Sequence, residues 1–466
     1  MPDQKQELLR SLPSVTDLLK SETVAGWLRQ HPQPLVTECL RRAVADVRRH
    51  ILDGAAIGQP TEAVLALAER HLLNATEPHV REAINATGII LHTGLGRAVL
   101  PAGVIDSMLG ELKGYCTLAV DRETGERAER DELVEYILTE LTGAEAATVV
   151  NNNAAATMLV LAALAAPKEV IVSRGQLIEI GGSFRLPEVM AQSGARLVEV
   201  GATNRTHLKD YQKAITENTA GILRAHPSNY RVVGFTSEVP LRELSELCVQ
   251  RQLMLIDDLG AGALVDLMLF GLPHEPTVRE SIEAGADVVL FSGDKLIGAG
   301  QCGIIVGKKP LIEKLRKHPL MRAVRVDKGC LMVLERTLQL FRDPSKLARE
   351  HPTYRMISTS LADLKARAGQ LAHLIAAAAP QVQTEIRQSQ SFVGSGSLPT
   401  EAIASFEVIL SVPGRSAAEL ARRLRLDEAC IFGRIEEDRV RLDVRTLTDG
   451  QLPRMAAALG RIGELP

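Results

Sequence analysis

Two stretches, Leu253–Gly260 (LMLIDDLG) and Val288–Gly298 (VVLFSGDKLIG), decide the fold class that we expect for this chain. Each is a short apolar run that ends in polar residues, which is typical of a buried strand leading into a loop. Four similar runs precede them, with amphipathic or Ala-rich segments between most: AATVVN (146–151), EVIVSR (169–174), RLVEVG (196–201) and GILRAH (221–226). This alternation predicts an α/β fold with a mainly parallel sheet that helices cover on both faces. Ligands of such sheets bind beyond the carboxyl ends of the strands, so the loops there should carry the chemistry.

The loop after the second stretch contains Lys295, between Gly293 and Gly298. These glycines allow the backbone to turn sharply and to present the amine inward. A lysine that is removed from water has a lowered pKa and can form an imine with a carbonyl group. A lone loop lysine is usually solvated, but its place after an apolar strand favours a catalytic amine. Ser292, three residues earlier, could contact a phosphate.

The loop after the first stretch follows Asp257, at the end of its strand. A carboxylate there can pair with a protonated pyridine nitrogen and keep the ring an effective electron sink. Taken alone, an aspartate at this point is more often an ordinary helix cap. The neighbouring Asp258 is the alternative holder of the pyridine-binding role.

Two earlier strand ends add a phosphate cradle and a ring cover. TVVNNNAAATMLVL (148–161) runs from a strand into a helix, whose first N–H groups, with Asn152 and Asn153, can bind a phosphate. N-capping by Asn153 is the simpler reading, and both roles can coexist. Gln176 in EVIVSRGQLIEIGG (169–182) could cover the face of a ring. The order of cradle, ring cover, aspartate and lysine is that of fold-type I enzymes, which use pyridoxal 5'-phosphate.

The rest of the chain suggests three domains. Residues 1–80 read as an N-terminal helical domain, 81–340 as the large cofactor-binding domain and 341–466 as a small C-terminal α+β domain with an antiparallel sheet. Val36–Ile51 has an apolar stripe at helical spacing. Off that stripe lie Arg41, Arg42, Arg48 and Arg49, which make a small basic surface. A solvated helix face is the simple reading of that surface, and an RNA-docking face is the alternative.

Composition narrows the class of protein. The formal net charge is −3 over 466 residues, so any nucleic-acid surface must be local. Six scattered cysteines without a C-x-x-C pair argue against a disulfide framework or a zinc site and suit a reducing cytosol. The polar start of the chain and the lack of a long apolar run predict a cytoplasmic protein without a membrane span.

Several segments together resemble one family, the bacterial L-seryl-tRNA(Sec) selenium transferases, or selenocysteine synthases. The resemblance covers nearly the whole chain, and its most specific segments are INATGIILHTGLGRA (84–98), NNNAAA (151–156), FSGDKL (291–296), HPLMRAVRVDK (318–328) and GSGSLP (394–399). It implies a transferase in selenocysteine biosynthesis, which acts on serine esterified to tRNA(Sec). Lys295 would remove the α-proton, the β-hydroxyl would leave as water, and selenophosphate would supply selenium.

The resemblance also suggests residues that bind the substrates. Arg97, Arg322 and Arg325 match the family's candidate anion-binding arginines, Arg130 is a further candidate, and Asp294 resembles a residue near the catalytic centre. Guanidinium groups suit the tetrahedral oxygens of selenophosphate. Two positions depart from the expected pattern, because the chain has Ala128 in place of Gly and Gly94 in place of Asn.

The family resemblance further implies that the N-terminal domain contacts the tRNA and that subunits assemble as a ring of dimers, a homodecamer. Two other functions stay open. One is a pyridoxal-phosphate lyase that acts on a free amino acid or amino sugar acid, which would need neither the N-terminal extension nor the arginines. The other is a non-catalytic RNA-binding protein, which an intact pair of Asp257 and Lys295 disfavours.

Overall fold

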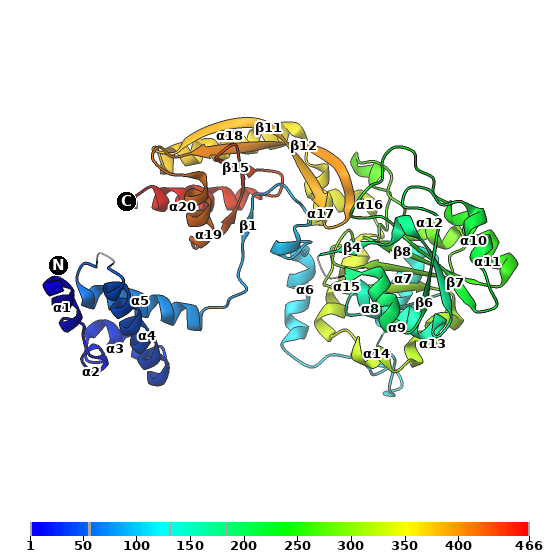
Figure 1. The fold of residues 1–466 in the computed structure, drawn as a ribbon, viewed down its shortest axis with the longest axis horizontal. Coiled ribbons are helices and arrows are strands. Elements are labelled where there is room, and N and C mark those ends of the chain that lie inside the picture. The colour runs from blue at the N-terminus through cyan, green and yellow to red at the C-terminus, as the bar shows by residue number, and fades with distance from the viewer. Residues whose placement is uncertain (1, 55–56, 131, 182–183, 465–466) are drawn as a thin grey trace. The chain divides into compact units, whose positions relative to one another are not determined.

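The computed structural model describes residues 2–54, 57–130, 132–181 and 184–464. The chain divides into two compact units, residues 1–82 and residues 83–466 (Figure 1). Among the described residues, no helix is both long and apolar enough to cross a membrane. The expected domain boundaries near residues 80 and 340 remain a proposal, and the two units are described separately below.

The first unit is helical. Its elements are α1 (Pro2–Arg10), α2 (Val15–Leu18), α3 (Glu22–Leu28), α4 (Gln33–Leu52) and α5 (Pro60–Thr76). The predicted apolar stripe lies on α4, where Val36, Leu40, Val47 and Ile51 are buried in the unit's core. The four arginines between residues 41 and 49 are all exposed.

The second unit is built on a seven-stranded sheet in the order β2-β10-β9-β8-β7-β3-β6. The strands are β2 (Ala146–Val150), β3 (Glu169–Ser173), β6 (Arg196–Val200), β7 (Thr219–Ala225), β8 (Met254–Gly260), β9 (Val288–Ser292) and β10 (Gly303–Gly307). All neighbours are parallel except β10, which is antiparallel to both β9 and β2. The expected fold class is therefore confirmed. The sequence analysis did not predict β10, which returns from the Lys295 loop as the second arm of a hairpin.

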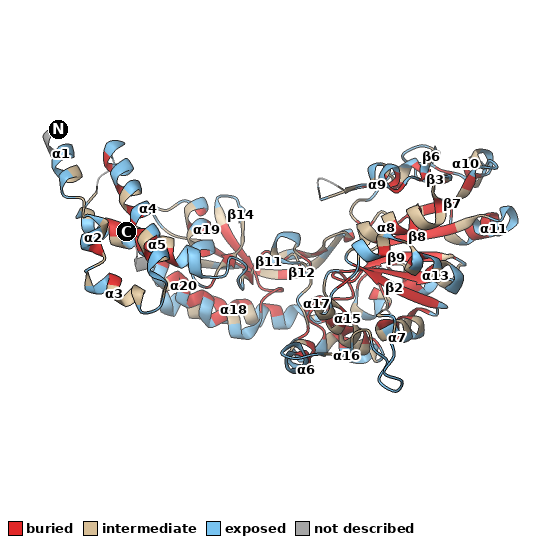
Figure 2. Ribbon diagram, turned by 90° about the horizontal axis from the view of Figure 1, so that it is seen from below, coloured by how far each residue is buried: buried red, intermediate tan, exposed pale blue. Residues whose placement is uncertain are grey.

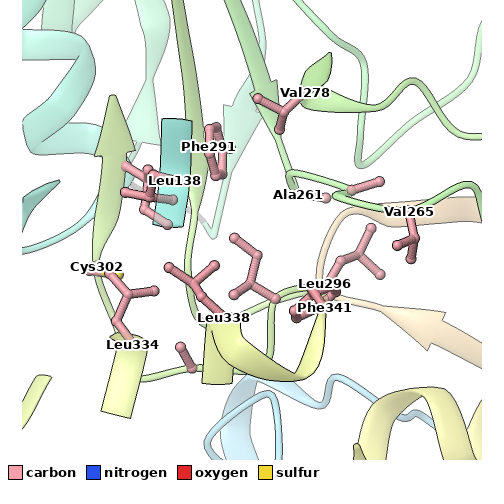
Figure 3. Close-up of a cluster of buried hydrophobic side chains, with 14 of the residues drawn as sticks. Leu138, Ala261, Val265, Val278, Phe291, Leu296, Cys302, Leu334, Leu338 and Phe341 are labelled. Atoms are coloured by element: carbon pink, nitrogen blue, oxygen red, sulfur yellow. The ribbon is translucent and has the colours of Figure 1, made fainter. Parts of the chain in front are cut away.

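Helices cover both faces of this sheet, as the buried strands in Figure 2 require. Val289 and Phe291 point to one face, where they pack with residues of α6 (Ala102–Leu112), α7 (Glu132–Thr142), α12 (Val278–Glu283) and α15 (Lys328–Leu340) (Figure 3). The alternate residues Val288 and Leu290 point to the other face, which α8 (Asn153–Val160), α9 (Leu186–Ser193) and α13 (Lys309–Lys317) cover. Two further helices, α10 (Leu208–Ala214) and α11 (Leu241–Arg251), pack on strands β3, β6, β7 and β8. Side-chain alternation thus assigns every strand residue to one of two differently covered faces.

The C-terminal part contains a four-stranded antiparallel sheet in the order β11-β12-β15-β14. Its strands are β11 (Gln383–Gly394), β12 (Ser397–Ser411), β14 (Arg434–Glu436) and β15 (Arg439–Asp443). Helices α16 (Pro344–Glu350) and α17 (Pro352–Ser358) precede this part, and α18 (Leu361–Ala378), α19 (Ala417–Leu426) and α20 (Leu452–Glu464) belong to it. A short parallel pair, β1 (Ile84–Asn85) with β13 (Ile431–Phe432), brings Ile84 and Ala86 into the same core.

The loop expected over residues 394–399 is shorter in the structure. Only Ser395 and Gly396 form the turn between β11 and β12, because Gly394 pairs with Ser397. Both turn residues have positive φ, 46° and 74°, as a two-residue hairpin turn that matches the twist of its strands requires. Of the other residues of the expected loop, Gly394 ends β11, and residues 397–399 begin β12.

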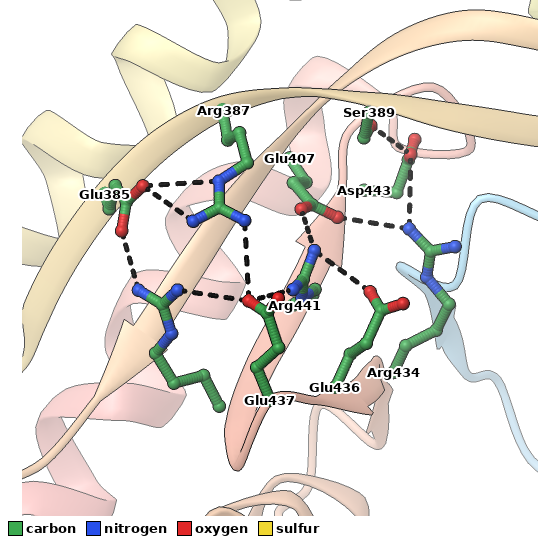
Figure 4. Close-up of polar contacts among 10 residues, drawn as sticks. Glu385, Arg387, Ser389, Glu407, Arg434, Glu436, Glu437, Arg441 and Asp443 are labelled. Carbon is green, nitrogen blue, oxygen red and sulfur yellow. Dashed lines mark hydrogen bonds and ion pairs between the residues drawn. The ribbon is translucent and has the colours of Figure 1, made fainter.

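A buried carboxylate, Asp443, joins the strands of the C-terminal sheet. Its oxygens accept hydrogen bonds from the hydroxyls of Ser389, Ser391 and Ser405 at 2.9, 3.0 and 2.8 Å, and from the backbone N–H of Arg445 at 3.0 Å. Figure 4 shows Asp443 at the edge of a wider network, in which Arg441 also pairs with buried Glu407 at 2.8 Å. These strands are therefore joined by polar contacts as well as by the apolar core.

We expect Asp443→Ala to destabilise the second unit strongly, because four donors would lose their shared acceptor in a site closed to water. The free energy of unfolding should fall by about 3–5 kcal/mol in denaturant titrations. Glu436→Ala is the matched control, since its carboxylate belongs to the same network, through Arg441, but is 58% exposed. Equal losses in both variants would contradict the importance of burial at Asp443.

Candidate active site

A cavity of about 400 Å³ opens at the carboxyl ends of the parallel strands, on the α8 face of the sheet. This volume is typical of a site for a small organic molecule. Residues after five different strands line it, together with the segment before α6. The lining includes Thr93, Arg97, Asn152, Asn153, Ala154, Ile178, Ile180, Phe184, His226, Ser228, Asp258, Gly260, Ser292, Lys295 and Gln301.

Lys295 lies in this cavity with only 6% of its surface exposed. Its loop is closed by backbone hydrogen bonds from Gly298 N to Lys295 O at 3.0 Å and from Ala299 N to Gly293 O at 2.9 Å. Gly298 has φ of 70°, and a side chain there would collide with the ring of His351. His351, whose pKa burial lowers to about 4, bonds the carbonyl oxygen of Ile297 through Nε2 at 2.8 Å. His351 thus fixes the loop at Ile297 and Gly298.

Removal from water lowers the pKa of Lys295, and the nearby Arg97 guanidinium lowers it further. The carboxylates of Asp258 and Asp294 act in the opposite direction but do not reverse the shift. A lowered pKa increases the fraction of neutral amine, which is the nucleophilic and basic form. The surroundings of Lys295 therefore favour the reactive, neutral form of its amine.

Asp294 and Arg97 form an ion pair beside Lys295. Arg97 Nη1 lies 2.5 Å from Asp294 Oδ2, and the Asp294 side chain is 10% exposed. Arg97 follows Gly96 in a turn where both residues have positive φ. The pair fixes the guanidinium at the cavity wall, next to the amine.

The carboxylate that faces the cavity belongs to Asp258. Its Oδ1 accepts hydrogen bonds from Asn153 Nδ2 at 2.9 Å and from Gly260 N at 3.0 Å, and Thr157 Oγ1 bonds Oδ2 at 3.2 Å. Burial raises the pKa of Asp258, and these hydrogen bonds and Lys295 oppose the rise.

The expected candidate, Asp257, points to the opposite face of the sheet. It is fully buried and bonds Arg224 Nη1 at 2.8 Å and Ser281 Oγ at 2.7 Å. Adjacent strand residues face opposite ways, and the sequence LMLIDDLG gave no sign of which aspartate faced the ligand. The structure thus places Asp257 outside the cavity and Asp258 in its wall.

The N-terminus of α8 forms one end of the cavity, with Asn152, Asn153 and Ala154 in its wall. Asn152, rather than Asn153, caps the helix by accepting a hydrogen bond from Ala155 N at 2.8 Å. Asn153 is thereby left to bond Asp258 and to face the cavity. Ser292, at the end of β9, is buried in the same wall. The structure brings these three side chains together with Lys295.

Gln176 does not line the cavity. It is buried, and its Oε1 accepts a hydrogen bond from Ala225 N at 3.3 Å. Apolar wall is supplied instead by Ile178, Ile180 and Phe184, which follow it in the chain.

His226 is a cavity residue that the sequence analysis missed. Its Nε2 lies 3.2 Å from Oε1 of buried Glu275, and its backbone N–H bonds Asp258 O at 2.8 Å. The available signal was its position as the last residue of the run GILRAH, directly after β7, which matches the strand-end rule used for the other candidates.

Arg130, Arg322 and Arg325 line a different pocket, of about 320 Å³, together with Arg127, Ala128, Arg316, Lys317 and His318. Asn151 N bonds Val324 O at 2.8 Å, so the segment that carries Arg325 runs beside the end of β2. The four expected anion-binding arginines are therefore divided, with Arg97 in the lysine cavity and three in the basic pocket. Ala128, one of the two departures from the family pattern, lines the basic pocket.

The lysine cavity fits pyridoxal phosphate. Within its wall, Asn153 Oδ1, His226 Nδ1 and Ser228 Oγ are buried and have no hydrogen-bond partner in the described structure, as expected for groups that meet a polar ligand. The helix N-terminus with Ser292 suits a phosphate, Asp258 suits a pyridinium nitrogen and Lys295 suits the aldehyde. Among the described residues, no group of three or more acidic, His or Cys side chains is arranged to hold a metal.

Comparison with known proteins matches this chain to one family. A family model described as L-seryl-tRNA selenium transferase matches residues 83–448, and one described as selenocysteine synthase N terminal matches residues 9–48. An L-seryl-tRNA(Sec) selenium transferase of Methylocella silvestris is 48% identical over 95% of both chains. One from Caldanaerobacter subterraneus is 45% identical over 96% of both.

A solved structure shares the fold at lower similarity. D-glucosaminate-6-phosphate ammonia-lyase superposes with a TM-score of 0.54 at 21% identity, over 83% of this chain and 96% of that one.

The two aspartates of β8 should respond differently to substitution. Asp258→Asn removes the charge that faces the cavity, so pyridoxal phosphate should bind roughly ten- to a hundredfold more weakly, with little change in stability. Asp257→Asn leaves the buried charge of Arg224 uncompensated, so it should lower the free energy of unfolding by about 3 kcal/mol. Cofactor titration and denaturant unfolding of both variants separate the roles. Weak cofactor binding in Asp257→Asn alone would restore the original assignment.

Proposed function

The chain belongs to the L-seryl-tRNA selenium transferase family, and from that membership we propose how its residues convert seryl-tRNA(Sec) to selenocysteinyl-tRNA(Sec). The single observation that carries the proposal is the desolvated Lys295 at the wall of the cavity, beside Asp258 and the N-terminus of α8. A base with a lowered pKa at the strand ends is what removal of an α-proton requires.

Pyridoxal phosphate, when bound, supplies an electron sink that makes the α-proton of an amino acid acidic. The chain's own residues then divide the remaining work. Ser292 and the first N–H groups of α8 would hold the phosphate, and Asp258 would pair with the protonated ring nitrogen. Lys295 would bind the cofactor's aldehyde and would then accept the α-proton. Arg97, held by Asp294, lowers the pKa of the amine and so favours its neutral form.

His226 is the group that we assign to the leaving hydroxyl. Loss of the β-hydroxyl as water needs a proton donor, and His226 is an imidazole in the cavity wall. Its contact with Glu275 at 3.2 Å orients the ring. This role would explain why a histidine at the end of β7 is paired with a buried carboxylate.

The selenium donor is assigned to the arginines. A tetrahedral oxyanion such as selenophosphate needs several convergent cations, and Arg130, Arg322 and Arg325 surround one pocket. Arg97 lies in the lysine cavity itself, where it can meet an anion that arrives at the reacting carbon. We therefore propose a donor site in the basic pocket and a final contact with Arg97.

The helical unit of residues 1–82 is assigned to tRNA binding. Arg41, Arg42, Arg48 and Arg49 are exposed on α4, where they can bind phosphates of an RNA backbone. A homo-oligomer, built as a ring of dimers, and a cytoplasmic location complete the proposal.

The direct test is to incubate the holoenzyme with seryl-tRNA(Sec) and selenophosphate and to identify the esterified amino acid. Selenocysteine is expected. Activity on free amino acids or amino sugar acids without any on the charged tRNA would instead favour a lyase, the chemistry named for the D-glucosaminate-6-phosphate enzyme.

Loss of an arginine from the basic pocket should affect only the second half-reaction. Arg322→Ala and Arg325→Ala should slow selenium addition by one to two orders of magnitude, since a charge-assisted hydrogen bond contributes roughly 1.5–3 kcal/mol. Elimination of water does not need the donor and should survive. Arg349→Ala, at an exposed pair with Glu350, is the control. If both half-reactions fall together, the donor binds elsewhere.

A proton donor at His226 predicts that its removal affects one step of the reaction. His226→Gln should slow elimination at least tenfold, because an amide cannot give a proton to the leaving hydroxyl. The exchange of the α-proton with solvent, which needs the cofactor and Lys295 but not His226, should be largely retained. Loss of exchange together with elimination would show that His226 only supports the cavity.

Removal of the helical unit should separate tRNA binding from cofactor binding. A chain of residues 83–466 should still bind pyridoxal phosphate but should lose affinity for tRNA(Sec). A full-length variant with alanine at the four α4 arginines should bind tRNA more weakly and with a smaller dependence on salt. Undiminished affinity in both would assign tRNA binding to other surfaces.

A further inference from the structure

Two cysteine side chains meet beneath the loop that carries Lys295. Cys302 directly precedes β10, and Cys330 lies in the first turn of α15. The two thiols lie close enough for each to shift the pKa of the other. Cys330 Sγ also lies 3.5 Å from the carbonyl oxygen of Gln301, the residue before Cys302.

This thiol pair contacts both ends of the Lys295 loop. Gly293 N bonds Cys302 O at 2.9 Å, and a Cβ added at Gly293 would lie only 2.3 Å from Cys302 Sγ. At the other end, a Cβ added at Gly300 would lie 3.6 Å from Cys330 Sγ. Because both glycines lack side chains, the sulfur atoms rest on the loop backbone itself. A movement of the sulfurs must therefore move the segment that contains Asp294 and Lys295.

The two thiols differ in exposure and acidity. Cys302 is fully buried, whereas Cys330 is partly exposed. The interaction with Cys302 lowers the pKa of Cys330, although burial and the carboxylates of Asp327 and Asp294 oppose ionisation. The same interaction, with burial, raises the pKa of Cys302 well above its ordinary value. Such an arrangement pairs an accessible attacking thiol with a protected resolving thiol.

We propose that Cys302 and Cys330 form a modification site at which a peroxide converts the two thiols into a disulfide, and that this bond slows the reaction of Lys295 with its cofactor. The site is built from the loop and from α15, so the proposal does not depend on which substrate the enzyme uses.

The chemistry is complete with hydrogen peroxide as the oxidant. The Cys330 thiolate attacks one peroxide oxygen, the O–O bond breaks, and a sulfenic acid and one water form after protonation. Cys302 sulfur then attacks Cys330 sulfur, an S–S bond forms and the hydroxyl leaves as a second water. The two sulfurs together lose two electrons, which reduce the peroxide. A dithiol reductant reverses the change.

Formation of the bond should displace the loop. A disulfide holds its sulfurs at about 2.05 Å, which is closer than any hydrogen-bonded thiol pair. Cys302 is fixed in the β9–β10 hairpin, so the strain passes to Gly293 and to the adjacent Asp294, whose carboxylate holds Arg97 at 2.5 Å. The cofactor should therefore enter oxidised protein more slowly.

The test counts thiols and follows cofactor capture in full-length apoprotein. After brief treatment with stoichiometric hydrogen peroxide, two of the six cysteines should become unreactive to a maleimide. A cross-linked peptide pair that contains Cys302 and Cys330 should appear by mass spectrometry. The visible absorbance should develop at least tenfold more slowly on addition of pyridoxal phosphate, and dithiothreitol should restore the rate.

Variants keep the test specific. Cys330→Ser should retain normal cofactor capture and be insensitive to peroxide, whereas Cys116→Ser, at another partly exposed cysteine, should behave as the parent. Cys302→Ala tests the same point should the serine variant be unstable. A disulfide between other cysteines, or oxidation of Cys330 alone, would overturn the site. A Cys302–Cys330 disulfide with an unchanged rate of capture would overturn its control of Lys295.

Discussion

The exclusion of water from Lys295 is the constraint on which the rest of the site depends. An ammonium group buried to this extent is unfavourable, so Lys295 loses its proton more readily than a solvated lysine does. Asp258 and Asp294 compensate part of that cost, and Arg97 prevents them from compensating all of it. The amine is consequently reactive because of where the fold places it.

The fold provides this environment through a hairpin. Strand β9 brings the chain to the carboxyl edge of the sheet, and β10 returns antiparallel, so the loop between them is held at both ends. His351 bonds the loop from below and fits against Gly298, where only a glycine leaves room. Cys302 makes the corresponding contact at Gly293. Each support comes from the core that α15 and the following helices complete, which ties the reactivity of one amine to the packing of a whole face of the sheet.

The sequence predicted much of this arrangement, and its failures have clear physical causes. The six strands followed from their apolar runs, because burial on both faces leaves a strong pattern. Lys295, Asn152, Asn153 and Ser292 were found because all follow strands that end at one edge. The same rule could not choose between Asp257 and Asp258, since adjacent residues face opposite sides and both are buried.

Other differences between the expected and the observed site involve residues whose partners lie far away in the sequence. Gln176 was expected at the cavity because of its place after β3, but its side chain accepts a hydrogen bond from the backbone of β7 instead. The arginines were grouped by family resemblance, and the structure separates Arg97 from the other three. The partnership of Cys302 with Cys330, or of His226 with Glu275, joins residues whose spacing has no local signature.

The central claim is that desolvation makes Lys295 the amine that holds the cofactor, and reductive trapping tests it most directly. Holoenzyme treated with borohydride should carry the cofactor on a peptide that contains Lys295. A competing lysine, Lys308, follows the far end of β10 and lies 2.6 Å from Asp287, and that contact raises its pKa, so it should remain unlabelled. Label on Lys308 or Lys309, with Lys295 free, would contradict the account.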